Sequence, residues 1–536
     1  MRIAVVGGGP GGLFAGSLIK RSDPGHEVTV FERNRAADTF GFGVVFSDAT
    51  LAGIHAADPV LRTALSEHGV HWDAIEVRAG GERHRCGGNG MAAVERKMLL
   101  SLLQRQAADE GVDVRFCSEA DIDAVLGAGY DLVVAADGAN SRFRERYRDA
   151  FGPSVETATA KFIWLGTRYP FEGLTFVHER GPHGVFAVHG YPIGNGVSTF
   201  IVETDESSWF AAGLDEFDVN SPPGRSDDKS RAYLQELFAG QIDGRPLLVN
   251  NSRWGNFRTH RAQRWRHRIG GTAIALLGDA AHTAHFSVGS GTKMAMEDAI
   301  ALAAAVAVAA QPDDLDAALA EYEKVRRPQV EKIQDSARPS LSWWEHFGRS
   351  HDTLPGWQFA YHFFTRSLTD AKLARRDPRF VQATHAQWEA AHGARPLDSP
   401  LTLSGHTVPA RTVTVGPGVV RVAADTLALL RAADDQHPAL AGRPGDAGWA
   451  LEIIAPQTEA DLGPALEAVA KGAASGAALV AVRAGTPLTR RLICEEARLG
   501  HGTPALLVED SDADTATTAI LSGRADLVAA PGGANA

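Results

Sequence analysis

The stretch RIAVVGGGPGG, Arg2–Gly12, decides the fold expected for the first part of this 536-residue chain. Its first five residues form a short, β-branched, apolar run, which is typical of a buried parallel strand. A glycine-rich turn follows, in which Gly7 suits a tight turn, Gly9 lets the backbone approach a pyrophosphate and Gly12 lets a helix pack closely on the strand. The stretch therefore predicts the strand–turn–helix unit of a dinucleotide-binding site.

A second strand-like run, EVTVFE, ends at Glu32, twenty residues after Gly12. In dinucleotide-binding folds an acid at this distance hydrogen-bonds the ribose, so Glu32 is a candidate ribose ligand. Its neighbour Arg33 is a further candidate contact. The intervening helix would direct its unpaired N–H groups at the phosphates. A purely structural glycine turn is the alternative, but it accounts for neither the helix nor the acid. The motif alone does not separate NAD from FAD.

The composition is that of an ordinary globular protein, with 44% hydrophobic and 22% charged residues, and the length allows two or three domains. The net charge of −12 argues against general affinity for nucleic acid. The three cysteines, Cys86, Cys117 and Cys494, lie far apart, which fits a reducing compartment. No cluster of His, Cys and carboxylate residues has metal-ligand spacing, so we expect no metal.

The start of the chain enters a strand directly and has no apolar stretch of the kind that a secretory signal requires. The longest apolar run, Ala299–Ala310, is too short to span a bilayer. We therefore expect a cytoplasmic protein without a membrane partner.

Two further apolar runs end in carboxylates. The run Leu132–Ala135 leads into Asp137-Gly138, and the run Thr272–Leu277 leads into Gly278-Asp279. Ligands of open α/β sheets bind at the carboxyl ends of the strands. Asp137 and Asp279 are therefore candidate ligand contacts at the same edge of the sheet as the glycine turn.

The stretch HFSVGSGTKMAM, His285–Met296, looks at first like the end of a phosphate-binding P-loop. A P-loop needs a hydroxyl residue directly after its lysine, to bind magnesium. Here Met294 follows Lys293, and the first glycine of the motif is missing as well. The P-loop interpretation fails, and the glycines Gly289 and Gly291 need another explanation.

These motifs together resemble the flavoprotein aromatic hydroxylases, the group typified by para-hydroxybenzoate hydroxylase, over roughly residues 1–395. The resemblance implies a bound FAD, with Asp137 near the passage of FAD and the nicotinamide nucleotide, and Asp279 on the ribityl chain. It also implies that Gly289 and Gly291 let backbone N–H groups approach the flavin at a helix N-terminus. An arginine at the place of Arg96, which starts a helical pattern, reaches toward the FAD in this family; a solvated arginine is the alternative.

The runs GDAAHTAHFS and GFGVVFSD resemble the branch of this family that acts on aromatic acyl-CoA thioesters. The commoner form of the motif has prolines after the histidine and asparagine at the position of Lys293. The branch implies hydroxylation of salicyloyl-CoA at C5, to the 2,5-dihydroxybenzoyl (gentisyl) thioester, with NADH and O₂ as co-substrates. The 2-amino analogue, 2-aminobenzoyl-CoA, is the close alternative substrate.

Two other classes share the fold or the cofactor. A flavin reductase of the geranylgeranyl reductase type is one alternative, and a flavin-bearing interaction protein whose tail is the functional part is the other. Flavin halogenases are disfavoured, because their Trp-x-Trp-x-Ile-Pro motif is absent.

We expect an α/β protein built from a Rossmann-type FAD-binding domain, an inserted antiparallel-sheet substrate domain, a helical region and a small C-terminal α/β domain. The alternating runs KFIWLGTRYPF, LTFVHER, GVFAVHGYP and VSTFIVET predict the antiparallel sheet. These patterns give the domain boundaries. The FAD-binding domain comprises residues 1–155 and 269–310, and the substrate domain comprises residues 156–268. The helical region comprises residues 311–395, and the C-terminal domain comprises residues 396–536.

The stretch RWGNFRTHRAQRWRHR carries six arginines, two histidines and no acid. Planar guanidinium groups suit phosphates, so this stretch is a candidate site for the CoA phosphates or NADH. A solvated rim that makes ordinary salt bridges is the alternative. The candidate phosphate ligands are Arg253, Arg258, Arg261 and Arg264.

Two histidines precede the glycine turn. His282 is expected to be a hydrogen-bonding element of the loop. His285 lies closer to the expected flavin edge and is the candidate to contact the substrate hydroxyl or the thioester carbonyl. A structural hydrogen bond is the alternative for His285 too.

The tail resembles the beginning and the end of an old yellow enzyme barrel, in the runs PLDSPLTLSGHTVPARTVTV and ICEEARLGHGTPALLVEDSD. A full (β/α)₈ barrel needs about 250 residues, and the segment 396–536 is shorter. Arg524 stands where such barrels contact the FMN phosphate, but the rest of that site is missing. We therefore expect a shortened barrel-like domain without FMN, for packing or for contacts in a homodimer.

Overall fold

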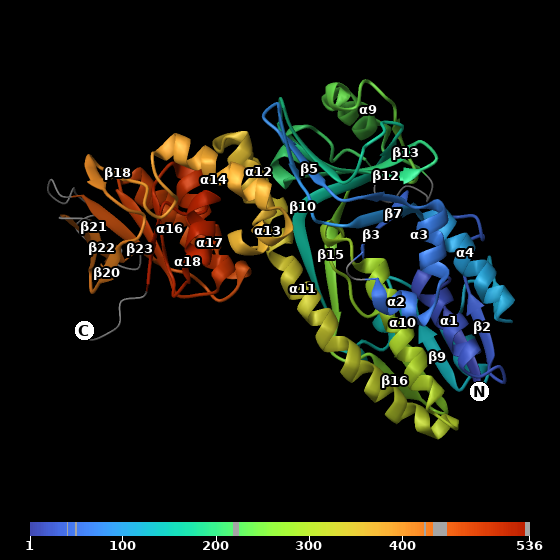
Figure 1. Cartoon of the computed structure of the whole chain (residues 1–536). Helices are drawn as coiled ribbons and strands as arrows, with labels where there is room; N and C mark the ends of the chain where they lie inside the picture. The colour runs from blue at the N-terminus through green and yellow to red at the C-terminus, as the bar shows by residue number, and fades with distance from the viewer. Residues whose placement is uncertain (40, 49–50, 218–224, 423–424, 432–447, 531–536) are drawn as a thin grey trace. The chain divides into compact units, whose positions relative to one another are not determined.

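The computed structural model describes residues 1–39, 41–48, 51–217, 225–422, 425–431 and 448–530. The chain forms two compact units (Figure 1). The first comprises residues 1–76 and 89–345, and the second comprises residues 77–88 and 346–536. Their division falls inside one long helix, α11 (Leu315–Thr353), and so within the helical region expected for 311–395.

The first unit is built on a six-stranded sheet in the order β16-β17-β9-β1-β2-β8. All neighbours are parallel except β16 and β17, which are antiparallel. The strands are β1 (Arg2–Val6), β2 (Glu27–Phe31), β8 (Asp113–Arg115), β9 (Leu132–Ala135), β16 (Arg266–Ile269) and β17 (Thr272–Leu276). The sheet is a Rossmann-type arrangement, with β1 in the middle and buried on both faces.

Three helices position the loops at the carboxyl ends of these strands. They are α1 (Pro10–Ser22), α4 (Arg96–Asp109) and α10 (Gly291–Ala307). A Cβ placed on Gly11 of α1 would lie 3.0 Å from the Cβ of Ala295 in α10. Small residues on both helices therefore allow α1 and α10 to pack closely side by side.

The expected antiparallel sheet is confirmed. Its strands in the first unit follow the order β14-β10-β13-β12-β11, and β15 pairs with β10. The bounds are β10 (Pro153–Thr167), β11 (Thr175–Gly181), β12 (Gly184–Gly194), β13 (Val197–Thr204), β14 (Leu247–Leu248) and β15 (Gly255–Ala262). A separate core, which includes Phe186, Phe200 and Leu234, packs one face of this sheet against α9 (Asp228–Leu237).

Shorter elements complete the first unit. A three-stranded sheet consists of β3 (Gly43–Ser47), β7 (Met91–Glu95) and β4 (Val70–Trp72). The remaining helices are α2 (Ala52–Ala57), α3 (Val60–His68), α5 (Ile122–Gly127), α6 (Arg142–Arg146), α7 (Arg148–Phe151) and α8 (Glu206–Ala211).

The second unit begins, unexpectedly, with residues from the N-terminal half. The hairpin of β5 (Ile75–Ala79) and β6 (Glu82–Cys86) contributes residues 77–88 to it. Three helices follow α11: α12 (Gly356–Phe364), α13 (Asp370–Arg376) and α14 (Pro378–His392). Asp377, the N-cap of α14, accepts a hydrogen bond from the backbone of Gly87, which joins the hairpin to these helices.

The tail folds into a seven-stranded sheet in the order β20-β21-β22-β23-β24-β25-β26. The first three strands are antiparallel and the last five, from β22, are parallel. The strands are β20 (Thr414–Gly416), β21 (Val419–Val422), β22 (Asp425–Arg431), β23 (Trp449–Ile454), β24 (Leu479–Arg483), β25 (Ala505–Val508) and β26 (Leu527–Ala529). Before them lies the hairpin β18 (Leu401–Leu403) and β19 (His406–Val408).

This sheet is nearly closed into a barrel. Val413, just before β20, donates a backbone hydrogen bond of 3.0 Å to Val528 of β26, and Val528 donates one of 2.9 Å to Arg411. Small apolar side chains such as Ala450, Ala481 and Ala529 pack in one core cluster. Helices α16 (Gly463–Ala474), α17 (Pro487–Glu495) and α18 (Ala513–Leu521) pack against the strands. The tail thus forms a nearly closed, barrel-like sheet with one hydrophobic core cluster.

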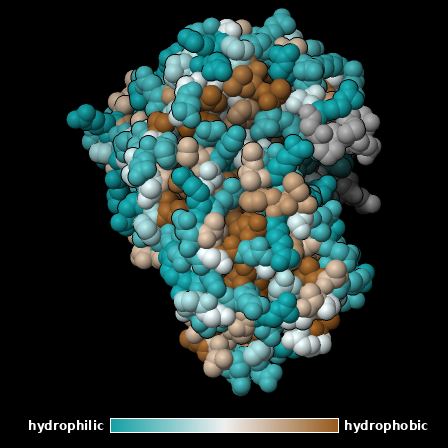
Figure 2. All heavy atoms as spheres, turned by 90° about the vertical axis from the view of Figure 1, so that its right-hand side faces the viewer, coloured by the Kyte–Doolittle hydropathy of each residue, from teal (hydrophilic) through white to brown (hydrophobic). Residues whose placement is uncertain are grey.

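The face shown in Figure 2 is mostly hydrophilic, and its apolar side chains lie in separate small patches. Scattered apolar residues of this kind are normal for a globular protein. Among the described residues, none of the helices is both long and apolar enough to cross a membrane.

Candidate functional site

A cavity of about 340 Å³ lies at the carboxyl ends of the parallel strands of the first unit. It brings together most of the residues that the sequence motifs indicated, although they are up to 272 positions apart (Gly7 to Asp279). The lining includes Gly7, Gly9, Glu32, Arg33, Arg96, Asp137 and Asp279. Gly12, Gly289 and Gly291 are not part of this lining.

The three glycines of the first turn differ in what surrounds them. Gly7 has a φ of +117°, and a Cβ there would lie 2.1 Å from the carbonyl oxygen of Ala136. A Cβ on Gly12 would lie 2.0 Å from the carbonyl oxygen of Gly7. A Cβ on Gly9 would meet no atom within 4 Å. Backbone crowding therefore requires glycine at Gly7 and Gly12, whereas Gly9 leaves open space at the cavity wall.

Glu32 braces the loop that surrounds this space. Its Oε2 accepts a hydrogen bond of 2.8 Å from the backbone N–H of Gly8. Its Oε1 accepts bonds of 2.8 and 2.7 Å from the backbone and side-chain nitrogens of Asn34. Because each carboxylate oxygen can accept more than one hydrogen bond, Glu32 can hold the loop and still accept from a ribose hydroxyl.

One carboxylate oxygen of Asp137 accepts no hydrogen bond from the described residues. Its Oδ2 accepts a bond of 2.7 Å from the backbone of Arg142, but its Oδ1 is buried and has no hydrogen-bond partner within the described residues. A buried polar atom of this kind normally requires a partner. The cavity therefore fits a ligand that donates a hydrogen bond at Asp137.

Arg96 and Asp279 bring opposite charges to the wall of the cavity, where Arg96 is half-buried and Asp279 is exposed to the open space. Burial lowers the pKa of Arg96, while the carboxylate of Asp279 counteracts the effect. Burial raises the pKa of Asp279, and His282 and Arg96 oppose that rise. The two charges partly compensate each other, and both face the cavity.

Helix α10 begins beside Asp279 with an uncapped N-terminus. Its N-cap, Ser290, makes no side-chain capping bond, and its hydroxyl oxygen is buried without a partner in the described residues. Gly289 has a φ of +61°, and a Cβ on Gly291 would meet no atom within 4 Å. The first N–H groups of α10 are thus available to a ligand with negative charge or acceptor atoms.

A dinucleotide such as FAD fits these residues. Both α1 and α10 begin without a side-chain cap, so two helix N-termini offer unpaired N–H groups. The open acceptor of Asp137 and the hydroxyl of Ser290 offer further partners. Within the described part of the chain, no group of three or more His, Cys, Asp or Glu residues is placed to hold a metal ion.

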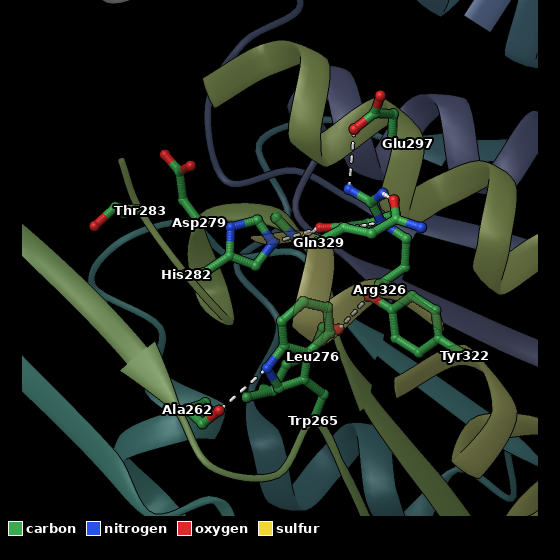
Figure 3. A network of polar contacts seen from close by, with 12 residues as sticks. Ala262, Trp265, Leu276, Asp279, His282, Thr283, Glu297, Tyr322, Arg326 and Gln329 are labelled. Atoms are coloured by element: carbon green, nitrogen blue, oxygen red, sulfur yellow. Dashed lines mark hydrogen bonds and ion pairs between the residues drawn. The ribbon is translucent and has the colours of Figure 1, made fainter. Parts of the chain in front are cut away.

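His282 belongs to a buried ionic cluster behind the Asp279 turn (Figure 3). Its Nε2 lies 2.6 Å from Oδ2 of Asp298, whose Oδ1 accepts a bond of 2.8 Å from Nε of Arg326. In Figure 3, Asp279 lies on the far side of His282 from Arg326. His282 is therefore a hydrogen-bonding element of the loop.

His285 points into a second buried cluster, which sequence patterns did not reveal. Its Nε2 lies 3.2 Å from Oε1 of Glu203, and Nε2 of His189 lies 2.5 Å from the other oxygen, Oε2. Glu203 is only 1% exposed and lies in the apolar strand β13. A carboxylate inside such a strand was the signal available in the run VSTFIVET.

Aromatic rings gather around Phe286, the residue after His285. The ring centroid of Phe286 lies 5.0 Å from Phe162, 5.8 Å from Trp164 and 6.1 Å from Phe257. All four residues are only half-buried. We define them as the aromatic surface of this site; Phe162 and Trp164 come from β10, Phe257 from β15 and Phe286 from the loop that precedes α10.

The four candidate phosphate ligands do not form one cluster. Arg258 and Arg261 point to opposite faces of β15, because they are three residues apart in a strand. Arg261 is paired with Asp335 at 3.1 Å. Arg258 and Arg264 are exposed, and Arg253 is half-buried just before β15.

Comparisons with known proteins show the family to which this chain belongs. Residues 1–337 match the family model described as FAD binding domain. The chain is 57% identical over 534 residues to salicyloyl-CoA 5-hydroxylase of Streptomyces sp, covering 98% of this chain and 99% of that protein. It is 38% identical over 343 residues to 3-hydroxy-4-methyl-anthranilyl-[aryl-carrier protein] 5-monooxygenase of Streptosporangium sibiricum, covering 64% and 89%.

Among solved structures, 2-methyl-3-hydroxypyridine-5-carboxylic acid oxygenase in its tetrameric form matches 68% of this chain and 98% of its own, with a TM-score of 0.48 and 20% identity.

Proposed function

The chain belongs to the FAD binding domain family, and from this premise we propose that it is an FAD-dependent monooxygenase that hydroxylates salicyloyl-CoA at C5, with NADH and O₂ as co-substrates. The observation that carries the proposal is the identity of 57% with salicyloyl-CoA 5-hydroxylase over nearly the full length of both chains. The cavity at the strand ends supports it, because its open hydrogen-bonding groups fit FAD.

In this proposal different residues around the cavity bind different parts of FAD. The turn at Gly7, Gly9 and Gly12 and the N-terminus of α1 hold the pyrophosphate, and Glu32 accepts from the ribose. Asp279 accepts from the ribityl hydroxyls, and Arg33, Arg96 and Asp137 complete the contacts. The N-terminus of α10, with Gly289 and Gly291, faces the flavin ring. When bound, the flavin supplies the reduction of O₂ and the transfer of one oxygen atom.

The chain's own task is to hold the substrate ring and to exclude water from it. We place the ring against the aromatic surface of Phe162, Trp164, Phe257 and Phe286. Half-buried aromatic side chains provide apolar area and favour stacking with another ring. His285, next to Phe286, is the candidate contact of the ring hydroxyl or the thioester carbonyl.

We further propose that the CoA phosphates bind at the arginine stretch. Arg258 and Arg264 are exposed, and guanidinium groups suit phosphate. Because Arg261 is already paired with Asp335, it would have to exchange that partner. Arg253 is the fourth candidate.

The 2-amino analogue, 2-aminobenzoyl-CoA, is the second candidate substrate. The observation that favours it is the identity of 38% with a monooxygenase whose name specifies an anthranilyl thioester, on a carrier protein rather than on CoA. Both substrates carry an electron-donating group beside the thioester, so the same site could orient either ring.

For the tail we propose a shortened barrel of the old yellow enzyme type that binds no FMN, with 396–536 as its domain. The near closure of the β20–β26 sheet supports the barrel. Arg524, the candidate FMN contact, is instead occupied inside the second unit: it donates to the carbonyl of His362 and to Thr365 Oγ1, and pairs with Glu495.

The test is NADH and O₂ consumption by the purified flavoprotein with salicyloyl-CoA, 2-aminobenzoyl-CoA and free salicylate, with the product mass measured alongside. We expect fast oxidation and a product heavier by one oxygen atom with a thioester only. Turnover of free salicylate, or no response to either thioester, contradicts the proposal. NADH oxidation without O₂ incorporation into product indicates a flavin reductase instead.

A further inference from the structure

Glu203 is a buried carboxylate that lies between two imidazoles of the described part of the chain. It is 1% exposed, and its Oε1 and Oε2 lie 3.2 Å from His285 Nε2 and 2.5 Å from His189 Nε2. His189 belongs to the neighbouring strand β12, and His285 to the loop before α10. On the other side Glu203 is paired in register with Phe162 of β10, which carries no charge. An isolated buried carboxylate is costly, so its ionised state depends on these two imidazoles.

The backbone fixes the tautomer of His285. The backbone N–H of Ser287 donates to Nδ1 of His285 at 3.3 Å, so Nδ1 is the acceptor nitrogen. In neutral His285 the hydrogen is therefore on Nε2 and is donated to Glu203. The hydroxyl of Ser287 lies 2.8 Å from the same Nδ1 and 3.1 Å from the hydroxyl of Ser340 on α11.

Polar contacts thus converge on one carboxylate from two sides. Hydroxyl groups of Ser340 and Ser287 lead to His285 and on to Glu203, while His189 reaches Glu203 from β12. Burial alone would raise the pKa of Glu203, but His285 and His189 hold the pKa below its ordinary value. The carboxylate is therefore ionised and stabilises an added proton on either imidazole.

This cluster adjoins the aromatic surface. The ring of Phe286 lies 4.2 Å from the ring of His285 and 5.4 Å from that of His189, centroid to centroid. The ring of His189 also lies 4.4 Å from Trp344 of α11, on which His178 of β11 stacks. A substrate ring held at the aromatic surface would lie beside the imidazoles of the cluster.

We propose that an imidazole of the pair His189 and His285 takes up the proton of the substrate's ring hydroxyl, and that the Glu203 carboxylate between them orients the imidazoles and stabilises the imidazolium. This inference rests on the proposed function. In the step the O–H bond of the phenol breaks and an N–H bond forms on one imidazole, which becomes an imidazolium beside the Glu203 carboxylate. No electrons are exchanged. The resulting phenolate makes the ring richer in electrons, and the proton returns to the ring oxygen after hydroxylation.

In this arrangement an imidazole meets the substrate, and Glu203 is a positioning residue that orients both imidazoles and balances their charge. General-base catalysis of this kind contributes about 100-fold or more to a rate. An uncharged replacement of Glu203 should therefore lower the rate of hydroxylation at neutral pH without abolishing thioester binding.

The experiment compares Glu203→Gln with Glu206→Gln in the flavin-loaded full-length protein. Glu206 lies just beyond the same strand, half-exposed, and pairs with Lys161, so its replacement should change nothing. With salicyloyl-CoA bound, we expect a phenolate absorption band in the wild type and in Glu206→Gln and none in Glu203→Gln at neutral pH. Hydroxylation by Glu203→Gln should fall about 100-fold and recover as the pH is raised far enough to ionise the phenol in solution.

An unchanged phenolate band and an unchanged pH profile of kcat in Glu203→Gln overturn the inference while leaving the proposed function intact. No thioester-dependent NADH oxidation by the wild type overturns the proposed function itself. If Glu203→Gln does not retain flavin, His189→Gln and His285→Gln apply the same test. Each variant leaves the carboxylate with one imidazole. If both variants keep the phenolate band, the inference is contradicted.

Discussion

Nε2 of His282 lies 2.6 Å from Oδ2 of Asp298, and both side chains are almost completely buried. The same oxygen accepts a bond of 3.2 Å from the backbone N–H of Gly278, and Arg326 is bonded to the other oxygen. One carboxylate of α10 therefore ties α10 to the turn that carries Asp279 and to α11. This tie holds the turn of Asp279 against α10 and α11.

Replacing Asp298 by asparagine should destabilise the first unit strongly. The change leaves Arg326 buried with less compensation, and breaking a buried pair costs about 3–5 kcal/mol. Urea unfolding followed by flavin fluorescence measures the loss. Asp123→Asn is the control, because Asp123 and its partner Arg146 are both exposed; an exposed pair contributes about 0–1 kcal/mol. Equal stability of the two variants would contradict the role of Asp298.

The same variant has a predictable pH dependence. His282 and Arg326 hold the pKa of Asp298 below its ordinary value, against the effect of burial. A lowered pKa in the folded state stabilises the protein above the unfolded-state pKa of about 3.9, and this stabilisation is lost as the pH falls through the folded-state pKa. The stability difference between wild type and Asp298→Asn should therefore be full at neutral pH and shrink below about pH 4.

Gly12→Ala should affect the stability of the protein, whereas Gly9→Ala should affect its binding of FAD. At Gly12 a Cβ would lie 2.0 Å from the carbonyl oxygen of Gly7, so the turn must move, and overpacking of this kind costs about 1–3 kcal/mol or more. At Gly9 there is room for the Cβ, which would instead stand in the way of the pyrophosphate. Gly12→Ala should lower Tm, whereas Gly9→Ala should keep the Tm of the flavin-free protein and weaken FAD binding. Titration with FAD and thermal unfolding separate the two outcomes.

Replacing Asp279 by asparagine should increase stability and weaken FAD binding. Burial raises the pKa of Asp279, so in the flavin-free protein its ionised form costs stability as the pH rises from about 3.9 through the raised value. Because Asp279 is exposed to solvent in the flavin-free protein and its charge is screened, removing the charge should stabilise that form only slightly, by less than ~1 kcal/mol at neutral pH. The FAD dissociation constant should rise, because the amide accepts from the ribityl hydroxyls less strongly. Lower stability of the flavin-free variant would show that Asp279 has a structural partner instead.

Arg524→Ala should destabilise the second unit, and addition of FMN should not change the Tm of the wild type or of the variant. The side chain is buried, and its removal leaves Glu495 without its ion pair and Thr365 without a donor. The expected loss is about 3–5 kcal/mol, measured as a shift in thermal unfolding. Arg421→Ala, at an exposed position on β21, is the control. A rise in Tm of the wild type, but not of Arg524→Ala, on addition of FMN would show instead that the tail binds FMN through Arg524.

Local patterns predicted the elements of the FAD-binding region accurately. The strand expected at Leu132–Ala135 has those bounds, and the strand expected at Thr272–Leu277 ends one residue earlier. The helix expected from Arg96 begins there. These elements are predictable because apolar runs, glycine turns and helix periodicity are short-range signals. The membership of residues 77–88 in the second unit was not predicted, since no local signal links them to residues near 377.

In the candidate site, too, some residues could be predicted from local patterns and others could not. Five cavity-lining residues could be named in advance because each follows a recognisable strand: Gly7, Gly9, Glu32, Asp137 and Asp279. Glu203 and Asp298 could not, because each obtains its role from partners in other elements: His189 on β12, and Arg326 on α11. In a strand a shift of one residue turns every side chain to the other face, so such pairings depend on the register between strands.

The amino-acid sequence was thus sufficient to specify the α/β class, the dinucleotide-binding turn, the antiparallel sheet and the family resemblance. The folded chain was needed to reveal which charges are buried together, that β20 and β26 nearly close a barrel, and that Glu203 lies between two histidines. The physical reason is one of distance along the chain. Turns and amphipathic patterns are encoded within a few residues, whereas the stabilisation of a buried carboxylate depends on cations that only three-dimensional packing brings within hydrogen-bonding distance.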